Sequence, residues 1–168
     1  MDKDRNDGFI EADQWIPIYL GLLEEDKYVK LAPKGGSMLP FLTGDRDEVI
    51  LKKIRRPLKR GDVVLYRREN GIYVLHRIHH IDKEKKLYFM IGDSQTWVEG
   101  PLEQRQILAV AHGFIRKGKE IKTDKFGYHL FYKIWLFVRP VRPYIIGIWW
   151  RINKLLGKEV NGDNQSKD

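Results

Sequence analysis

The sequence predicts a mainly β protein, in which an antiparallel β-domain follows a short helix and precedes a helical segment. Residues 30–116 contain short runs rich in β-branched and aromatic residues, such as "DEVILKKI", "DVVLYRR" and "KLYFMIGD", with turn signals between them. Hydrophobic residues make up 42% of the chain, as in proteins that fold around a core. A chain of 168 residues is long enough for one such core with additions at its ends.

The N-terminal region, residues 1–29, is predicted to be an acidic helical extension. Its stretch "FIEADQWIPIYLGLLEED" places apolar residues at helical spacing, and Pro17 and Gly21 limit the prediction to one short or kinked helix. Residues 1–13 are polar and contain neither the apolar core of a signal peptide nor a membrane anchor. We therefore expect the protein to be cytoplasmic.

The β-domain, residues 30–116, contains a hairpin signal. The turn sequence "ENG" separates "VVLYRR" from "IYVLHRI". Asn-Gly tolerates the positive φ angles that tight hairpin turns require, so we expect these two runs to pair as antiparallel strands. Alternate residues of each strand then lie on opposite faces of the sheet.

The C-terminal region is predicted to be a basic, aromatic helical segment at residues 117–158, followed by a disordered tail at residues 159–168. Its apolar runs "IWLFV" and "YIIGIWW" are shorter than the ~20 residues that a membrane-spanning helix needs. Two interpretations stay open. Either the aromatic side chains pack on the open side of the β-domain, or residues 126–158 lie on an anionic membrane, which would place the protein peripherally on the inner membrane face.

The net charge of +8 is unevenly distributed. Residues 113–158 hold eleven Lys and Arg against two acids, and the run "LKKIRRPLKR" holds six bases and no acid. Such clusters attract the phosphates of nucleic acid or anionic lipid, or they form solvated faces. The chain has no cysteine, which excludes disulfides, thiolate catalysis and cysteine-based zinc sites. The sequence predicts neither a cofactor nor a metal ion.

Ser37 lies between two glycines and a Met-Leu-Pro sequence, where it is either a turn residue or an exposed nucleophile. A serine hydroxyl needs a base within hydrogen-bonding reach and donors for the oxyanion. In "YVLHRIHH", strand alternation places His76 on the same face as Val74 and Ile78, the apolar side. Burial there keeps the imidazole neutral at pH 7, as a general base requires, although a core histidine without a catalytic role fits the same pattern.

Four stretches follow one another in an order that resembles a known family. They are "GGSMLPFL", "LKRGDVVLYRR", "YVLHRIHHID" and "MIGDSQ". In this order they resemble the boxes of type I signal peptidases and of LexA-like serine peptidases, over roughly residues 30–113. The box "VLHR" has a histidine where bacterial signal peptidases have a lysine, so it is most similar to the histidine-containing branch of the endoplasmic reticulum.

This resemblance implies a LexA/signal-peptidase-like fold and a serine-type endopeptidase that cleaves an extended peptide or leader segment. Ser37 matches the nucleophile of the family, and His76 matches the general base. Glu99 matches the acid that completes a triad in the histidine-type branch. Asp93, in "GDSQ", matches a residue that supports the site and is the rival candidate for the acid.

The remaining site candidates lie beside Ser37. Gly35 replaces a hydroxyl-bearing oxyanion donor of some relatives, so we expect the oxyanion hole to use backbone N–H groups, including that of Ser37. Gly35 and Gly36 let a substrate backbone approach closely. Met38 and Pro40 are candidates for lining a substrate pocket, with core packing as the alternative.

A second hypothesis is a non-catalytic module that binds a peptide through its β-domain and lipid or nucleic acid through its basic surface. The run "LKKIRRPLKR" supports it, because peptide hydrolysis does not require such a run. The ordered motifs around Ser37 and His76 favour the peptidase. The residues before the β-domain are too few for a helix-turn-helix unit, so the partner we expect is a peptide or protein substrate rather than nucleic acid.

Overall fold

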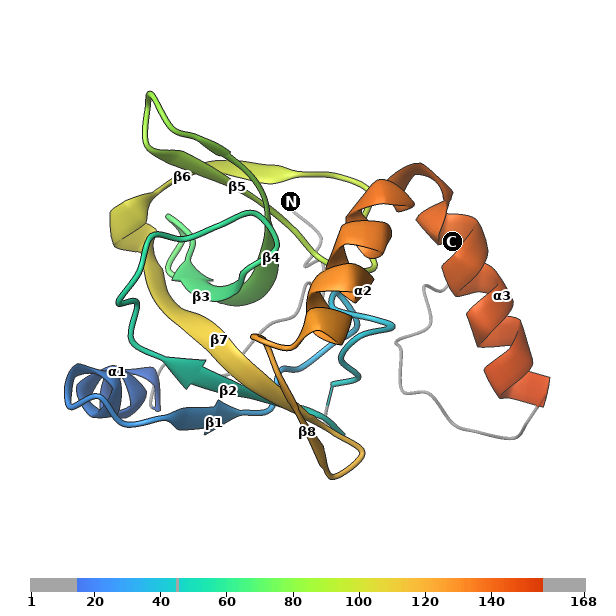
Figure 1. The fold of residues 1–168 in the computed structure, drawn as a ribbon, viewed down its shortest axis with the longest axis horizontal. Helices are drawn as coiled ribbons and strands as arrows, with labels where there is room; N and C mark the ends of the chain where they lie inside the picture. The colour runs from blue at the N-terminus through green and yellow to red at the C-terminus, as the bar shows by residue number, and fades with distance from the viewer. Residues whose placement is uncertain (1–14, 45, 156–168) are drawn as a thin grey trace.

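A computed structural model describes residues 15–44 and 46–155 and contains one eight-stranded sheet (Figure 1). All strand pairs are antiparallel, in the order β1-β2-β7-β3-β4-β5-β6, with β8 pairing with β7. The mainly β prediction is therefore confirmed. The strands are β1 (Val29–Leu31), β2 (Glu48–Lys52), β3 (Val63–Arg67), β4 (Tyr73–Asp82), β5 (Leu87–Ile91), β6 (Glu99–Glu103), β7 (Ile107–Arg116) and β8 (Lys119–Lys122). The last of them, β8, lies within the segment that the sequence assigned to the C-terminal region.

Helices flank the sheet in the chain, as predicted. They are α1 (Ile16–Glu24), α2 (Phe126–Phe137) and α3 (Arg142–Leu155), with 3₁₀ turns η1 (Gln104–Gln106) and η2 (Arg139–Val141). Pro17 lies in the first turn of α1, where its missing N–H leaves no helical hydrogen bond unmade. Residues 1–14 of the predicted N-terminal extension and the predicted tail at residues 159–168 lie outside the described residues.

The predicted hairpin joins β3 and β4. Its loop closes with a hydrogen bond from the Arg68 N–H to the Ile72 carbonyl, 2.8 Å long. Gly71 has a φ of +88°, a conformation that side-chain-bearing residues rarely adopt. The Asn-Gly signal therefore identified this turn correctly.

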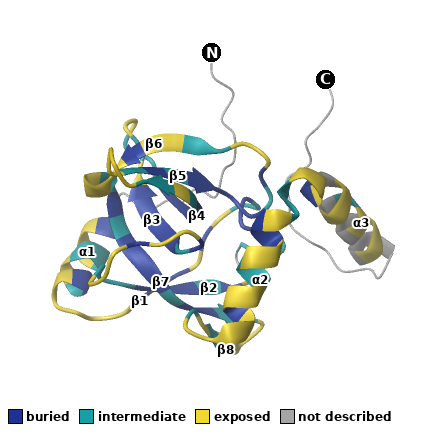
Figure 2. Ribbon diagram, turned by 45° about the horizontal axis from the view of Figure 1, so that its top comes forward, coloured by how far each residue is buried: buried dark blue, intermediate teal, exposed yellow. Residues whose placement is uncertain are grey.

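The sheet has an apolar core on each of its two faces. Leu65 and Leu75 belong to the first core, which α1 and the α2 residue Tyr128 also help to form (Figure 2). Val64 and Val74 belong to the second core. This alternation means that neighbouring residues of β4 point into different environments, and the candidate site depends on that difference.

Three of the six bases in the run at residues 51–60 form ion pairs with acids. Lys53 forms an ion pair with Glu24, Arg55 with Asp26, and Arg56 with Asp62. The acidic end of α1 therefore neutralises part of this run. Among the residues that the structure describes, no helix combines the length and apolar character needed to cross a membrane.

Candidate active site

Ser37 lies in the loop between β1 and β2, and this loop packs against the turn that follows β5. The Ser94 N–H and hydroxyl both donate to the Ser37 carbonyl, at 2.9 and 3.0 Å. A methyl group on Gly92 would lie 2.7 Å from the same carbonyl oxygen, so only glycine permits this approach. The motifs "GGSMLPFL" and "GDSQ" are thus brought together by main-chain contacts.

His76 lies on β4, opposite Val64 of β3, and its side chain is fully buried. In the pairing of β4 with β5, Arg77 is opposite Ile91. Continuing that register by one residue places Gly92 opposite His76, and partners across a strand pair share a face. The Ser37 carbonyl, which packs on Gly92, therefore lies beside the end of the β4–β5 pair that carries His76.

Tyr66 and Glu99 determine which nitrogen of His76 carries the proton. The Tyr66 hydroxyl donates to the Glu99 carboxylate at 2.8 Å, and its oxygen lies 3.1 Å from His76 Nδ1. Because the single hydroxyl proton is used by Glu99, the contact with His76 requires an N–H at Nδ1. The neutral ring then carries its free lone pair on Nε2, which makes Nε2 the basic nitrogen.

Glu99 is held by Arg68 through two hydrogen bonds, each 2.6 Å long. Burial works to raise the pKa of Glu99, but the hydrogen bonds from Arg68 and Tyr66 hold this pKa below its ordinary value. The carboxylate oxygen lies 3.8 Å from His76 Nδ1, so the acid reaches the ring mainly through Tyr66. The sequence named Glu99 as a candidate acid, and the structure places it near His76, but sequence reasoning missed Tyr66 and Arg68. Strand alternation along β3 could have indicated Tyr66, because it places Tyr66 on the same face as Val64, the residue opposite His76.

Ser37 Oγ and His76 Nε2, the atoms of the candidate nucleophile and base, are both buried. Among the described residues, Ser37 Oγ and His76 Nε2 have no hydrogen bond, either with each other or with another group. Burial lowers the pKa of His76 to about 4, against a smaller opposing effect of the Glu99 charge. The ring is therefore neutral at pH 7, as the sequence predicted for a base.

Asp93 is engaged elsewhere. Its carboxylate accepts two hydrogen bonds from Arg77, at 2.8 and 2.7 Å, and both side chains are fully buried. The Arg77 guanidinium also donates to Tyr128 Oη and to the Gly61 carbonyl. Asp93 therefore fixes the turn after β5, whereas Glu99 is the acid nearest the His76 ring.

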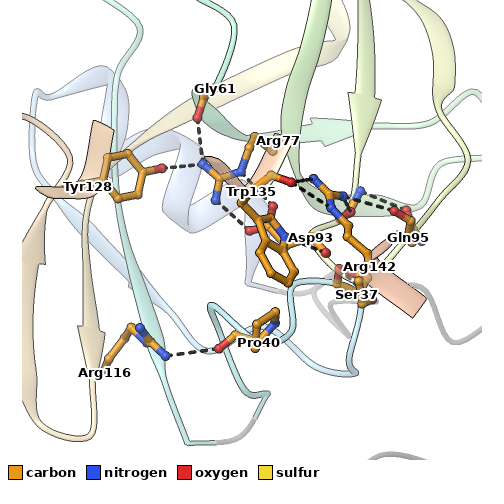
Figure 3. Close-up of polar contacts among 12 residues, drawn as sticks. Ser37, Pro40, Gly61, Arg77, Asp93, Gln95, Arg116, Tyr128, Trp135 and Arg142 are labelled. Atoms are coloured by element: carbon orange, nitrogen blue, oxygen red, sulfur yellow. Dashed lines mark hydrogen bonds and ion pairs between the residues drawn. The ribbon is translucent and has the colours of Figure 1, made fainter. Parts of the chain in front are cut away.

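The C-terminal segment holds the turn that contacts Ser37. Trp135 Nε1 donates to the Asp93 carbonyl at 2.8 Å, and buried Arg142 donates to the carbonyls of Gly92 and Gln95 (Figure 3). Arg139 donates to the Thr96 carbonyl. Sequence reasoning missed this role, because nothing in the spacing of these basic residues indicates carbonyl partners.

The glycines and the hydrophobic residues around Ser37 have distinct places. Gly35 has a φ of +78° and shapes the loop, and the Gly36 carbonyl accepts a hydrogen bond from the Leu39 N–H. Met38 is buried in the first core. Pro40 is half-buried, and its carbonyl accepts a hydrogen bond from Arg116 at 3.1 Å.

The site contains titratable groups suited to proton transfer. Across residues 15–44 and 46–155, no group of three or more His, Asp or Glu side chains is placed to hold a metal ion. No family model matches the chain, and no match was found among curated proteins or solved structures. A functional interpretation therefore depends on the ordered motifs and on the geometry of His76, Tyr66, Glu99 and Ser37.

Proposed function

We propose that the protein is a serine endopeptidase in which Ser37 is the nucleophile and His76 the general base. The observation that carries this proposal is the hydrogen-bond pattern of His76, which leaves a buried lone pair on Nε2 without a partner among the described residues. A buried polar group without a partner destabilises the folded protein by about 1–3 kcal/mol. Each such group therefore calls for an explanation, and a catalytic role is one. The Ser37 hydroxyl, which also lacks a partner among the described residues, is the proton donor that we assign to this lone pair.

In the proposed reaction, Ser37 Oγ attacks the carbonyl carbon of an extended peptide and transfers its proton to His76 Nε2. The resulting imidazolium lies close to the Glu99 carboxylate and stays hydrogen-bonded to Tyr66 through Nδ1. The proton then passes to the leaving amine as the peptide bond breaks. Water hydrolyses the acyl-enzyme by the same proton route in reverse, which restores the Ser37 hydroxyl.

A second candidate is a peptide-binding module without chemistry, and one observation favours it. Ser37 is 5% exposed and His76 is fully buried, so in this conformation a peptide carbonyl has no open path to the hydroxyl. The peptidase proposal therefore requires the Ser37 loop to open when substrate binds. The binding module requires no such opening.

Incubation of the full chain with a library of soluble peptides, read by mass spectrometry, tests both candidates. We expect cleavage that falls by a factor of about 1,000 or more in Ser37→Ala and in His76→Ala, because a serine without its base loses most of its reactivity. His80→Ala, an exposed neighbour on β4, is the matched control and should retain activity. Turnover that survives in Ser37→Ala would contradict the dyad. Binding of peptides without any cleavage by the wild type would favour the second candidate.

A further inference from the structure

Helix α2 has a second apolar face that does not pack on the sheet. Its buried side chains are Tyr128, Trp135 and Leu136, which fix the orientation of the helix. The opposite side presents large apolar residues at spacings of three and four, which place them on one stripe. They are Phe126 (80% exposed), Leu130 (47%), Ile134 (53%) and Phe137 (85%).

Helix α3 also presents exposed apolar side chains, and it stands apart from the sheet (Figure 1). Its exposed apolar side chains are Tyr144 (75%), Ile145 (38%), Ile148 (56%) and Ile152 (50%). Figure 2 shows both helices on one side of the molecule, and η2 connects them in the chain. Exposed apolar residues gathered in this way, rather than scattered singly, mark an interaction surface.

The charge of this segment limits the kind of partner. Residues 126–155 contain five Lys and Arg and no Asp or Glu. Lys133 on α2 and Arg151 on α3 are exposed, so cations accompany the apolar stripes. A second copy of this chain would bring two cationic surfaces together without an acid between them, and RNA would leave the aliphatic side chains uncovered. An anionic bilayer satisfies both features, because it offers negative headgroups above an apolar layer.

We propose that α2 and α3 form a docking surface for an anionic lipid bilayer. The helices lie in the interfacial plane, with the exposed stripes in the acyl boundary and the exposed Lys133 and Arg151 among the phosphates. This proposal is independent of the peptidase proposal, since it uses no residue of the His76 network. It also divides the C-terminal segment by face, so that one side of α2 packs on the β-domain and the other meets the lipid.

Flotation of the full chain with vesicles tests the proposal. We expect binding to vesicles of phosphatidylcholine with added phosphatidylglycerol that is roughly tenfold or more stronger than binding to phosphatidylcholine alone. Added salt should weaken it, because salt screens the attraction between the basic residues and the headgroups.

Matched isoleucine variants locate the surface. Ile134→Ser combined with Ile148→Ser should weaken binding roughly tenfold by removing two side chains from the acyl layer. Ile18→Ser is the control, because Ile18 on α1 is 55% exposed, compared with 53% for Ile134 and 56% for Ile148. Circular dichroism and thermal unfolding establish that each variant folds. The comparison of the two lipids in the wild type stands without any variant.

Several outcomes would overturn the proposal. Equal binding to both lipids, or an Ile18→Ser loss as large as that of the double variant, would remove its basis. A dimer in light scattering that disappears in the double variant, without vesicle binding, would assign the surface to a second copy of the chain. Retention on an RNA oligonucleotide without vesicle binding would assign it to nucleic acid.

Discussion

His76 and Arg77 are neighbours on β4 and are both fully buried, yet their hydrogen-bond partners differ. Arg77 points to the face of the first core, where Asp93, Tyr128 and the Gly61 carbonyl accept its hydrogen bonds. Burial alone would lower the pKa of Arg77, but the Asp93 charge holds this pKa above its ordinary value. His76 points to the other face and has a partner at Nδ1 but none at Nε2 among the described residues.

This difference separates a structural group from a candidate functional group. The fold supplies partners for a buried guanidinium, which is harder to satisfy than an imidazole because it has five donors and a permanent charge. Two histidine nitrogens on β4, His76 Nε2 and His79 Nδ1, have no hydrogen-bond partner among the described residues, although the same strand provides full partners for Arg77. Variants of the two residues should accordingly fail in different ways, Arg77 in stability and His76 in turnover.

Replacing Arg77 should produce the largest loss of stability. Arg77→Met leaves the Asp93 carboxylate buried without its partner, so we expect the free energy of unfolding to fall by about 3–5 kcal/mol. Urea unfolding at about pH 7 measures this loss. The paired change Arg77→Met with Asp93→Leu should recover part of it, because the unpaired charge is then removed.

Arg56→Met is the matched control for Arg77→Met. Arg56 also makes two hydrogen bonds to an aspartate, Asp62, but its side chain is 41% exposed. An exposed pair of this kind contributes about 0–1 kcal/mol. Equal losses in the two variants would show that burial does not distinguish the two pairs, and the comparison of His76 with Arg77 would lose its basis.

The lowered pKa of His76 predicts a loss of stability in acid. Burial places that pKa at about 4 in the folded protein, compared with about 6.5 in an unfolded chain. Between these values the unfolded chain binds a proton that the folded protein excludes, so stability is complete above about pH 6.5 and falls as the pH decreases toward 4. The full difference corresponds to about 3 kcal/mol.

Urea unfolding at about pH 7 and about pH 4.5 checks this prediction. His76→Leu removes the titrating ring, so its stability should change less between the two pH values than that of the wild type. His79 contributes in the same direction, because burial and Arg139 lower its pKa to about 4, and His79→Leu measures that share. A His76→Leu variant as acid-sensitive as the wild type would mean that His76 binds its proton freely in the folded state.

Much of the fold was predictable from local signals in the sequence. Strand alternation and the Asn-Gly turn identified the hairpin, and the position of His76 on an apolar face followed from the same alternation. The face shared by Val64 and Tyr66 was available from that rule too, but the partnership of Tyr66 with Glu99 was not. That contact joins residues 33 positions apart, and a sequence pattern does not report distances across a sheet.

The C-terminal segment shows a different limit. The sequence offered packing and membrane binding as alternatives, whereas the structure gives α2 a buried face and an exposed one. The hydrogen bonds from Arg142 to backbone carbonyls could not be predicted from the sequence. Every residue has a backbone carbonyl, so the composition does not indicate which carbonyl accepts. Side-chain identity predicts which groups need partners, and only the fold decides which partners they find.

Glu99→Gln should give the smallest effect of those considered, and it tests whether the acid acts through Tyr66. The amide keeps the shape of the side chain but loses the negative charge that supports the His76 imidazolium, so we expect kcat/KM to fall roughly tenfold, far less than in Ser37→Ala. The Glu99 charge also raises the pKa of His76 against the effect of burial, so its removal should move the acid limb of the kcat/KM profile to lower pH. Glu103→Gln, at the exposed end of the same strand, is the matched control and should change neither value.

Tyr66→Phe should match the loss in Glu99→Gln if the hydroxyl connects acid and base. A Tyr66→Phe variant with wild-type kcat/KM and an unshifted acid limb would instead mean that Glu99 acts on His76 directly across the 3.8 Å between them.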